Sequence, residues 1–152
     1  MGNTLNADFT EFIDALNKAE VEYILVGGYA VIYHGYSRTT GDLDIWVNPT
    51  TGNYNQLKRA FALFGMSLFD MTEEKFMKTE NYDVFTFGRP PVCIEILTSV
   101  KGLEFNNSYK NSALQNFDGM PVRMIDIRDL IIAKKSANRS KDKDDIEHLE
   151  MN

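Results

Sequence analysis

The sequence predicts an α/β (α+β) fold, in which a mixed β-sheet is flanked by helices and further helices follow at the C-terminal end. Two observations predict it. In the first half, apolar residues at helical spacing alternate with short apolar runs of strand character. In the second half, two apolar runs flank Gly88-Arg89-Pro90-Pro91, a turn sequence typical of a hairpin, which a regular doubly wound parallel sheet would not contain.

The first half is predicted to form helices and strands in alternation. The first helix shows an apolar residue at every third or fourth position, as in Phe9, Phe12, Ile13 and Leu16. The strands are short apolar runs that stop at Gly27-Gly28 and at Asn48-Pro49. The predicted elements are a helix over 8–20, a strand over 23–26, a short helix or tight turn over 29–36, a strand over 43–47 and a helix from 50 or 51 to 65.

The second half is predicted to add a hairpin and two terminal helices. No strand or helix is predicted in the stretch from 102 to 119, which contains glycine and several asparagines. The predicted elements are a weak helix over 72–78, strands over 82–87 and 92–97, a strand over 122–125 and helices over 127–137 and 142–150. Because no repeat, linker or low-complexity tract interrupts the chain, residues 1–152 are predicted to form a single domain.

Composition narrows the classes of function. The net charge of −6 disfavours non-specific binding to nucleic acid or to an anionic membrane, although residues 128–143 contain six basic and two acidic side chains. The lone cysteine, Cys93, excludes a disulfide within the chain and is typical of a reducing compartment. Since the sequence shows neither a membrane-spanning stretch nor a signal-peptide pattern, a cytoplasmic protein without membrane contact is expected.

Gly27-Gly28 directly follows a predicted strand and precedes a predicted helical segment. Two glycines at this place let backbone amides approach a phosphate closely, and a helix N-terminus adds to the attraction. The simpler alternative is a strand-to-helix turn that needs glycine for its conformation alone.

Asp42 and Asp44 are separated by one residue at the start of a predicted strand, so both carboxylates point to the same face. Paired carboxylates are oxygen ligands suited to Mg²⁺, whose remaining ligands are usually substrate phosphates and water. A second Asp-x-Asp pair, Asp142 and Asp144, falls in a predicted charged helix and is interpreted as solvated surface.

Glu95 interrupts an apolar strand, Val92–Leu97, where an acidic side chain is costly unless it is paired, exposed or bound to metal. If this strand lies beside the Asp42–Asp44 strand, three acids meet on one face, and a divalent cation would offset their repulsion. The alternative is an edge strand on which Glu95 simply faces water.

Taken together, these motifs resemble the DNA polymerase beta-like nucleotidyltransferase superfamily. The resemblance extends over about residues 8–150 and points to a bacterial branch of small stand-alone domains, related to minimal nucleotidyltransferases and to the toxins of AbiE-type toxin–antitoxin systems. The residues that carry it are Val26-Gly27-Gly28-Tyr29-Ala30, His34-Gly35, Arg38-x-Thr40-Gly41-Asp42-Leu43-Asp44-Ile45-Trp46, Ile94-Glu95-Ile96-Leu97-Thr98, Asp129-Leu130-Ile131 and Arg139-Ser140-Lys141-Asp142.

The resemblance implies a metal-dependent nucleotidyltransferase. Gly27 and Gly28 would hold the phosphates of a nucleoside triphosphate, and Asp42, Asp44 and Glu95 would bind two Mg²⁺ or Mn²⁺ ions. In the superfamily the third acid either completes the metal site or acts as base; this branch more often has aspartate at the position of Glu95. A hydroxyl acceptor on a small molecule, a tRNA or a protein would then attack the α-phosphate, and pyrophosphate would leave.

Several basic and aromatic residues have two interpretations each. Arg38 is either a phosphate clamp or a surface arginine, and Lys141 and Arg139 either bind phosphate or belong to a charged helix face. His34 is expected to be a packed or surface imidazole rather than a base. For the three tyrosines at near-helical spacing, packing is favoured over a role as a floor for the base; these are Tyr29, Tyr33 and Tyr36.

Two alternatives to an active enzyme remain open from the sequence. One is a nucleotide-binding module without turnover, since a chain of this length leaves little room for an acceptor domain. The other is a toxin held by an antitoxin-like partner. A homodimer is also an alternative, supported if Phe61, Phe64, Phe69 and Phe76 are exposed rather than packed in a core.

Overall fold

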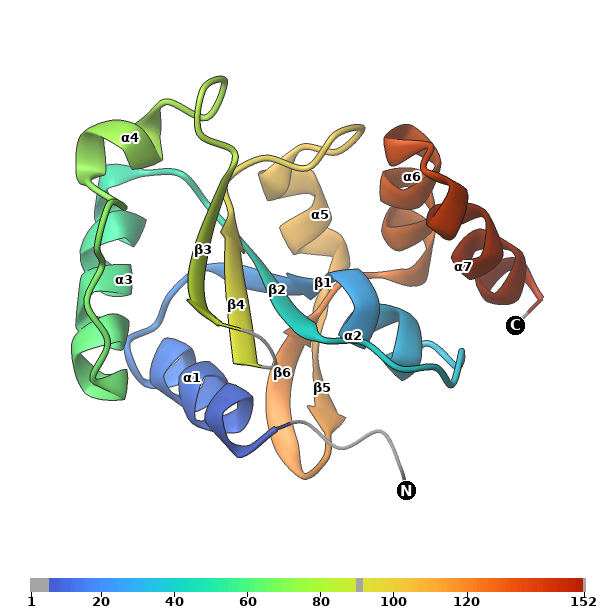
Figure 1. Ribbon diagram of the computed structural model, residues 1–152, viewed down its shortest axis with the longest axis horizontal. Coiled ribbons are helices and arrows are strands. Elements are labelled where there is room, and N and C mark those ends of the chain that lie inside the picture. Colours follow the sequence, from blue (N-terminus) through green and yellow to red (C-terminus); the bar gives the residue numbers. More distant parts are fainter. Residues whose placement is uncertain (1–5, 90–91, 152) are drawn as a thin grey trace.

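The computed structural model describes residues 6–89 and 92–151, and these form a six-stranded mixed sheet with helices around it (Figure 1). The strand order is β3-β4-β2-β1-β6-β5. Antiparallel pairs β1–β2, β3–β4 and β5–β6 are joined by the parallel pairs β2–β4 and β1–β6. The strands are β1 (Tyr23–Val26), β2 (Asp42–Val47), β3 (Val84–Arg89), β4 (Val92–Leu97), β5 (Ala113–Phe117) and β6 (Met120–Met124). The predicted mixed α/β fold is confirmed.

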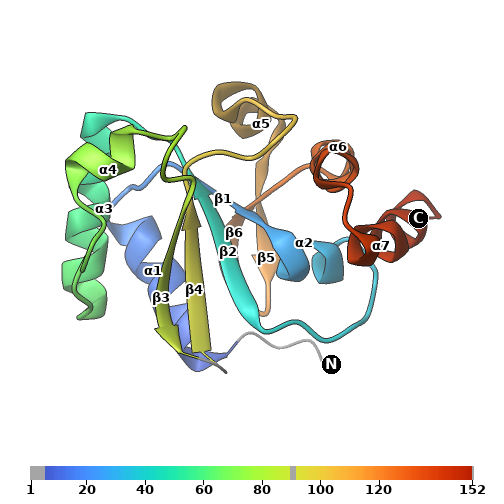
Figure 2. The same cartoon turned by 45° about the horizontal axis from the view of Figure 1, so that its top comes forward.

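Apart from α5, the helices lie beside the sheet in two groups. In both Figure 1 and Figure 2, α1, α3 and α4 lie on one side, whereas α2, α6 and α7 lie on the other. The helices are α1 (Ala7–Lys18), α2 (Gly27–Tyr33), α3 (Thr51–Phe64), α4 (Glu73–Met77), α5 (Phe105–Asn111), α6 (Ile127–Ala137) and α7 (Ser140–Glu150). No helix among the described residues is long and apolar enough to cross a membrane.

The hydrophobic core extends from the sheet to both groups of helices, and α1 and α3 contribute several of its large side chains. All four residues of the central strand β1 are buried, and α1 packs its apolar stripe against α3 through the edge-to-face contact of Phe12 with Phe61. Thr50 caps the start of α3, and Gly65 ends it in a left-handed conformation, as the sequence predicted. Of the four phenylalanines considered for a dimer surface, Phe61 and Phe76 are buried in this core, Phe64 is partly buried and Phe69 is exposed.

The prediction that residues 102–119 form no regular element is wrong. This stretch contains α5 and β5, and β5 pairs with β6 as a hairpin. The strand was missed because four of its five residues are exposed, so no alternation of apolar and polar residues marks it. A signal was present in Asp118-Gly119, a typical two-residue hairpin turn, and both residues have the positive φ that such a turn requires.

Several predicted boundaries shift. The helix α2 starts at Gly27 rather than at residue 29, β3 starts at Val84 rather than at 82, and α7 starts at Ser140 rather than at 142. The turn predicted over 88–91 is shorter than expected, because Gly88 and Arg89 belong to β3 and pair with Cys93 and Val92 of β4. The two prolines of the predicted turn lie outside the described residues.

Candidate functional site

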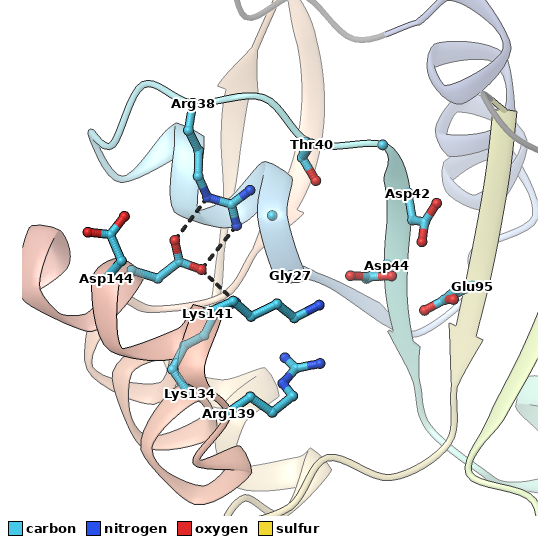
Figure 3. A pocket seen from close by; sticks show the side chains of 13 residues that line it. Gly27, Arg38, Thr40, Asp42, Asp44, Glu95, Lys134, Arg139, Lys141 and Asp144 are labelled. Atoms are coloured by element: carbon cyan, nitrogen blue, oxygen red, sulfur yellow. Dashed lines mark hydrogen bonds and ion pairs between the residues drawn. The ribbon is translucent and has the colours of Figure 1, made fainter.

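Three carboxylates meet on one face of the sheet, as the sequence predicted. Strands β2 and β4 are parallel neighbours, and their register sets Asp44 directly beside Glu95 and Asp42 beside Cys93. Because alternate residues of a strand share a face, Asp42 and Asp44 lie on the same face of β2, and the pairing places Glu95 on that face as well. Figure 3 shows the side chains of Asp44 and Glu95 next to each other. Strand β4 lies between β3 and β2, so the alternative of Glu95 on an edge strand facing water is wrong.

Asp44 lies in an unfavourable electrostatic environment. Its side chain is partly buried, and its Oδ1 atom is buried and accepts no hydrogen bond from any described residue. Burial and the nearby charges of Glu95 and Asp42 raise the pKa of Asp44 to about 8. A buried carboxylate oxygen without a donor, beside two further carboxylates, is an arrangement that a cation would relieve.

The glycine pair lies against this acidic face. Antiparallel pairing of β1 with β2 sets Val26 opposite Asp44, so the chain turns into α2 beside that carboxylate. Gly27 has φ +73°, and a Cβ atom there would lie 2.0 Å from Asp44 Oδ2; one on Gly28 would lie 2.1 Å from Thr40 Oγ1. Glycine is therefore needed at both positions because the backbone there lies too close to Asp44 and Thr40 for a Cβ atom. The need for glycine is thus not only one of turn conformation.

A cavity of about 640 Å³ opens over the glycines and the acids. Its second wall carries Lys134 from α6, Lys141 from α7 and Arg139 from the junction between these helices. In Figure 3 the side chains of Lys141 and Arg139 extend toward Asp44 and Glu95. The lining residues are Gly27, Gly28, Arg38, Thr40, Gly41, Asp42, Asp44, Glu95, Lys134, Arg139, Lys141, Asp144 and Asp145. The structure thus brings all seven predicted site residues into one cavity.

Arg38 reaches the cavity but is already engaged. Its Nε and one terminal nitrogen donate to the two oxygens of Asp145, at 2.9 and 3.0 Å, and its other terminal nitrogen donates to the Thr39 carbonyl at 2.8 Å. Each terminal nitrogen keeps a second hydrogen that is available to a ligand. Arg38 is therefore a structural ion-pair partner first, and any phosphate contact would use its remaining hydrogens.

The interpretation of Asp142 as solvated surface is wrong. Its side chain is 0% exposed, and its Oδ2 accepts from Arg139 Nε at 2.8 Å while Lys134 Nζ lies 3.5 Å from Oδ1. Burial raises the pKa of this carboxyl, but the hydrogen bond from Arg139 and the charge of Lys134 more than offset burial and leave the pKa lowered. The neighbouring Asp144 is exposed, as predicted.

Lys134 and Asp145 are two further buried charged residues that the sequence did not single out. Lys134 Nζ lies 3.1 Å from Asp145 Oδ2. A signal was present in the spacing of Asp142, Asp145 and Leu149, which repeats on one helix face. This spacing was not recognised because aspartates within a run of charged residues are usually interpreted as solvated surface.

The aromatic residues near the turn are packed, as the sequence favoured. Tyr29 makes an edge-to-face contact with Phe9, Tyr36 stacks on His148, and His34 Nε2 lies 2.7 Å from the Ile125 carbonyl. Neither His34 nor any of the three tyrosines lines the cavity, which agrees with packing rather than with a floor for a nucleobase.

Within the described residues, no group of three or more His, Cys, Asp or Glu side chains is arranged so that it could hold a metal ion. As placed here, Asp42, Asp44 and Glu95 therefore do not form a three-residue metal site on their own. Mg²⁺ sites commonly use only one or two protein carboxylates, with phosphate oxygens and water as the other ligands.

Comparison with known proteins identifies the family. The family model described as "Nucleotidyltransferase of unknown function (DUF6036)" matches residues 4–151, so the chain belongs to this family and the expected nucleotidyltransferase superfamily is confirmed. No curated protein matches the sequence.

Two solved structures are similar in fold. The lincomycin-bound crystal structure of the lincosamide antibiotic adenylyltransferase LnuA superposes with a TM-score of 0.57 at 14% identity, over 98% of each chain. An antigenic nucleotidyltransferase-like protein from Paracoccidioides brasiliensis gives a TM-score of 0.49 at 14% identity, over 95% of this chain and 77% of that one. The similarity to LnuA confirms the expected nucleotidyltransferase fold.

Proposed function

We propose that this nucleotidyltransferase moves a nucleoside monophosphate from a nucleoside triphosphate to a hydroxyl acceptor in a divalent-metal-dependent reaction. The observation that carries the proposal is the cavity itself: three carboxylates on one wall, basic side chains on the other and a glycine turn between them. In the reaction, the acceptor oxygen bonds to the α-phosphorus, the bond from that phosphorus to the bridging oxygen breaks, and pyrophosphate leaves.

Asp42, Asp44 and Glu95 would hold the metal, as two Mg²⁺ or Mn²⁺ ions. The fit rests on Asp44, whose buried Oδ1 has no donor among the described residues and whose pKa is raised by burial and by its two acidic neighbours. When bound, such ions supply charge neutralisation for the triphosphate and a lowered pKa for the acceptor hydroxyl.

The chain's own groups orient the nucleotide. The backbone at Gly27 and Gly28 lies open to the cavity because neither residue carries a Cβ, so a phosphate can approach the amides closely. Lys141 extends over the acidic face, where it would pair with phosphate oxygens, while Arg139 and Arg38, which are already ion-paired, can add their remaining hydrogens. Glu95 either completes the metal site or takes the proton of the acceptor hydroxyl.

The test is transfer of label from each of the four α-³²P nucleoside triphosphates in the presence of Mg²⁺ or Mn²⁺. Acceptors to be supplied are small hydroxyl compounds, including a lincosamide, bulk tRNA and cell protein, with pyrophosphate release measured in parallel. We expect the double variant Asp42→Asn/Asp44→Asn to lower transfer by about a hundredfold or more. Unchanged labelling in this variant would refute the site assignment.

Two controls separate folding from chemistry. The variant Asp14→Asn removes an exposed carboxylate that pairs with Lys18 on α1; neither residue lines the cavity, so this variant should transfer label like the wild type. Circular dichroism should show that both variants are folded. If the wild type binds a nucleoside triphosphate in calorimetry but releases no pyrophosphate with any acceptor, the chain acts as a nucleotide-binding module instead.

A further inference from the structure

The buried face of α7 is unusual in composition. Its fully buried side chains are Asp142, Asp145 and Leu149, so only one of the three is apolar. A surface helix normally docks through an apolar stripe. Here α7 instead docks largely through ion pairs to α6 and to the loop between α2 and β2.

Asp145 is the centre of this contact. It is 4% exposed, its Oδ1 accepts from Arg38 Nε, and its Oδ2 accepts from the Arg38 terminal nitrogen at 3.0 Å and lies 3.1 Å from Lys134 Nζ. The Asp145 carboxylate on α7 therefore binds both α6 and the loop that follows α2. Both of its oxygens are used by cations, so Asp145 is suited to hold other groups in place rather than to contact a substrate.

Lys141 lies four residues before Asp145 on the same helix, and residues at this spacing share a face. Its side chain is exposed, lines the cavity and extends toward Asp44 and Glu95, and it makes no hydrogen bond or ion pair with the rest of the described chain. The position of its ammonium group is therefore set by how α7 is docked, and not by a partner of its own.

We propose that Asp145 is a positioning residue that docks α7 so that Lys141 faces the acidic wall and reaches the phosphates of the nucleotide; this rests on the proposed function. Asp145 acts through Arg38 and Lys134, which belong to other segments of the chain. Removing the charge of Asp145 should weaken the docking of α7. Nucleotide affinity should then fall because Lys141 is no longer held toward the acidic wall, although the net positive charge around the cavity rises.

The chain offers a matched control on the same pair of helices. Lys135 on α6 and Glu150 on α7 form an ion pair at 2.9 Å, but both side chains are about half exposed and neither lines the cavity. Exposed pairs of this kind contribute little to stability. The variant Glu150→Gln thus breaks an α6–α7 ion pair without touching the cavity.

The first measurement needs no ligand. Hydrogen–deuterium exchange of the full chain should be about tenfold faster over residues 140–150 in Asp145→Asn than in the wild type, with the sheet unchanged and with Glu150→Gln resembling the wild type. Exchange in α7 that stays at the wild-type rate in Asp145→Asn would overturn the proposal, whatever the protein binds.

The second measurement is a double-mutant cycle on the dissociation constant of each Mg²⁺–nucleoside triphosphate, determined by calorimetry. We expect Lys141→Met and Asp145→Asn each to weaken binding about tenfold, and the double variant to weaken it by about tenfold as well, because both remove the same contact. A double variant about a hundredfold weaker would mean independent effects and would overturn positioning through Lys141.

Different results would refute the proposed function and the positioning role of Asp145. If the wild type binds none of the four nucleotides, the proposed function fails, while the exchange experiment still decides whether Asp145 docks α7. If the wild type binds a nucleotide and Asp145→Asn binds it equally well, the proposed function stands and the positioning role is refuted.

Discussion

Replacing Gly27 by alanine should disturb the site more than any other glycine-to-alanine change compared below. Gly27 has φ +73°, and a left-handed conformation costs a residue with a Cβ atom roughly 1–2 kcal/mol. The new Cβ would also lie 2.0 Å from Asp44 Oδ2 and 2.8 Å from Asp44 Cβ and Cγ, so the carboxylate must move. Overpacking of this kind costs about 1–3 kcal/mol. The sum predicts a loss of about 2–5 kcal/mol in the free energy of unfolding.

Two other glycines separate these contributions in urea unfolding experiments. Gly65 has φ +88° with nothing within 4 Å of its notional Cβ, so Gly65→Ala should lose only the conformational part, roughly 1–2 kcal/mol. Gly52, in the first turn of α3, has open space and no positive φ, so Gly52→Ala should be neutral or more stable by up to about 1 kcal/mol. If Gly27→Ala loses no more stability than Gly65→Ala, the close approach to Asp44 does not constrain the site, and the reasoning is refuted.

Three further predictions follow from buried charged and polar groups. In buffer with a chelator at pH 8, Asp44→Asn should raise the free energy of unfolding by about 1–3 kcal/mol in urea experiments, since it removes a carboxylate that burial and its acidic neighbours destabilise; a loss would contradict this. Asp142→Asn should lower the free energy of unfolding by about 3–5 kcal/mol, because the cations that pair with this buried carboxylate lose their counter-charge. Asp14→Asn, which removes an exposed carboxylate, should lower it by less than about 1 kcal/mol. Equal losses would contradict a stabilising buried ion-pair network. Burial raises the pKa of Tyr23 to about 12, so the stabilisation that its neutral phenol provides is complete below pH 10 and is lost as the pH rises toward 12. Between pH 9 and 12, the free energy of unfolding should therefore fall by about 2–3 kcal/mol more for the wild type than for Tyr23→Phe. Parallel curves for the two proteins would contradict this prediction.

The acidic wall could be predicted from sequence because its determinants are local or repeat with the strand period. Asp42 and Asp44 share a face by alternation, and Glu95 stands out as the one charge in an apolar strand. The parallel pairing that sets Glu95 beside Asp44 was an expectation conditional on strand order, which the residues themselves do not state. The resemblance to the superfamily implied that the three acids act together, but no strand order was predicted.

The basic wall was only partly predictable, because its geometry depends on contacts between distant segments. Nothing near Asp145 in the sequence shows that it meets Arg38, which lies 107 residues away. A charged run such as Lys141–Asp145 has the same local pattern whether it is solvated or docked through ion pairs. Strand β5 was missed for a related reason: its place is set by pairing with β6, not by a buried face of its own.

The balance of charge in the cavity leads to a prediction about how the nucleotide enters. Among the lining residues, four are basic and five are acidic, and the basic Arg38, Lys134 and Arg139 are already paired with Asp142 or Asp145. Lys141 is therefore the one lining cation without a partner among the described residues. A polyanionic triphosphate entering alone would meet a wall of carboxylates, and its repulsion would outweigh the attraction of a single lysine.

Nucleotide and divalent cation should therefore bind together. We expect calorimetry of the wild type to show binding of a nucleoside triphosphate with Mg²⁺ or Mn²⁺ and at least about a hundredfold weaker binding with excess EDTA, because the metal provides the charge that the cavity lacks. Asp42→Asn/Asp44→Asn removes much of the repulsion, so residual binding in this variant should depend far less on metal. Wild-type affinity that is unchanged by EDTA would contradict this account, since the basic wall alone would then suffice to hold the triphosphate.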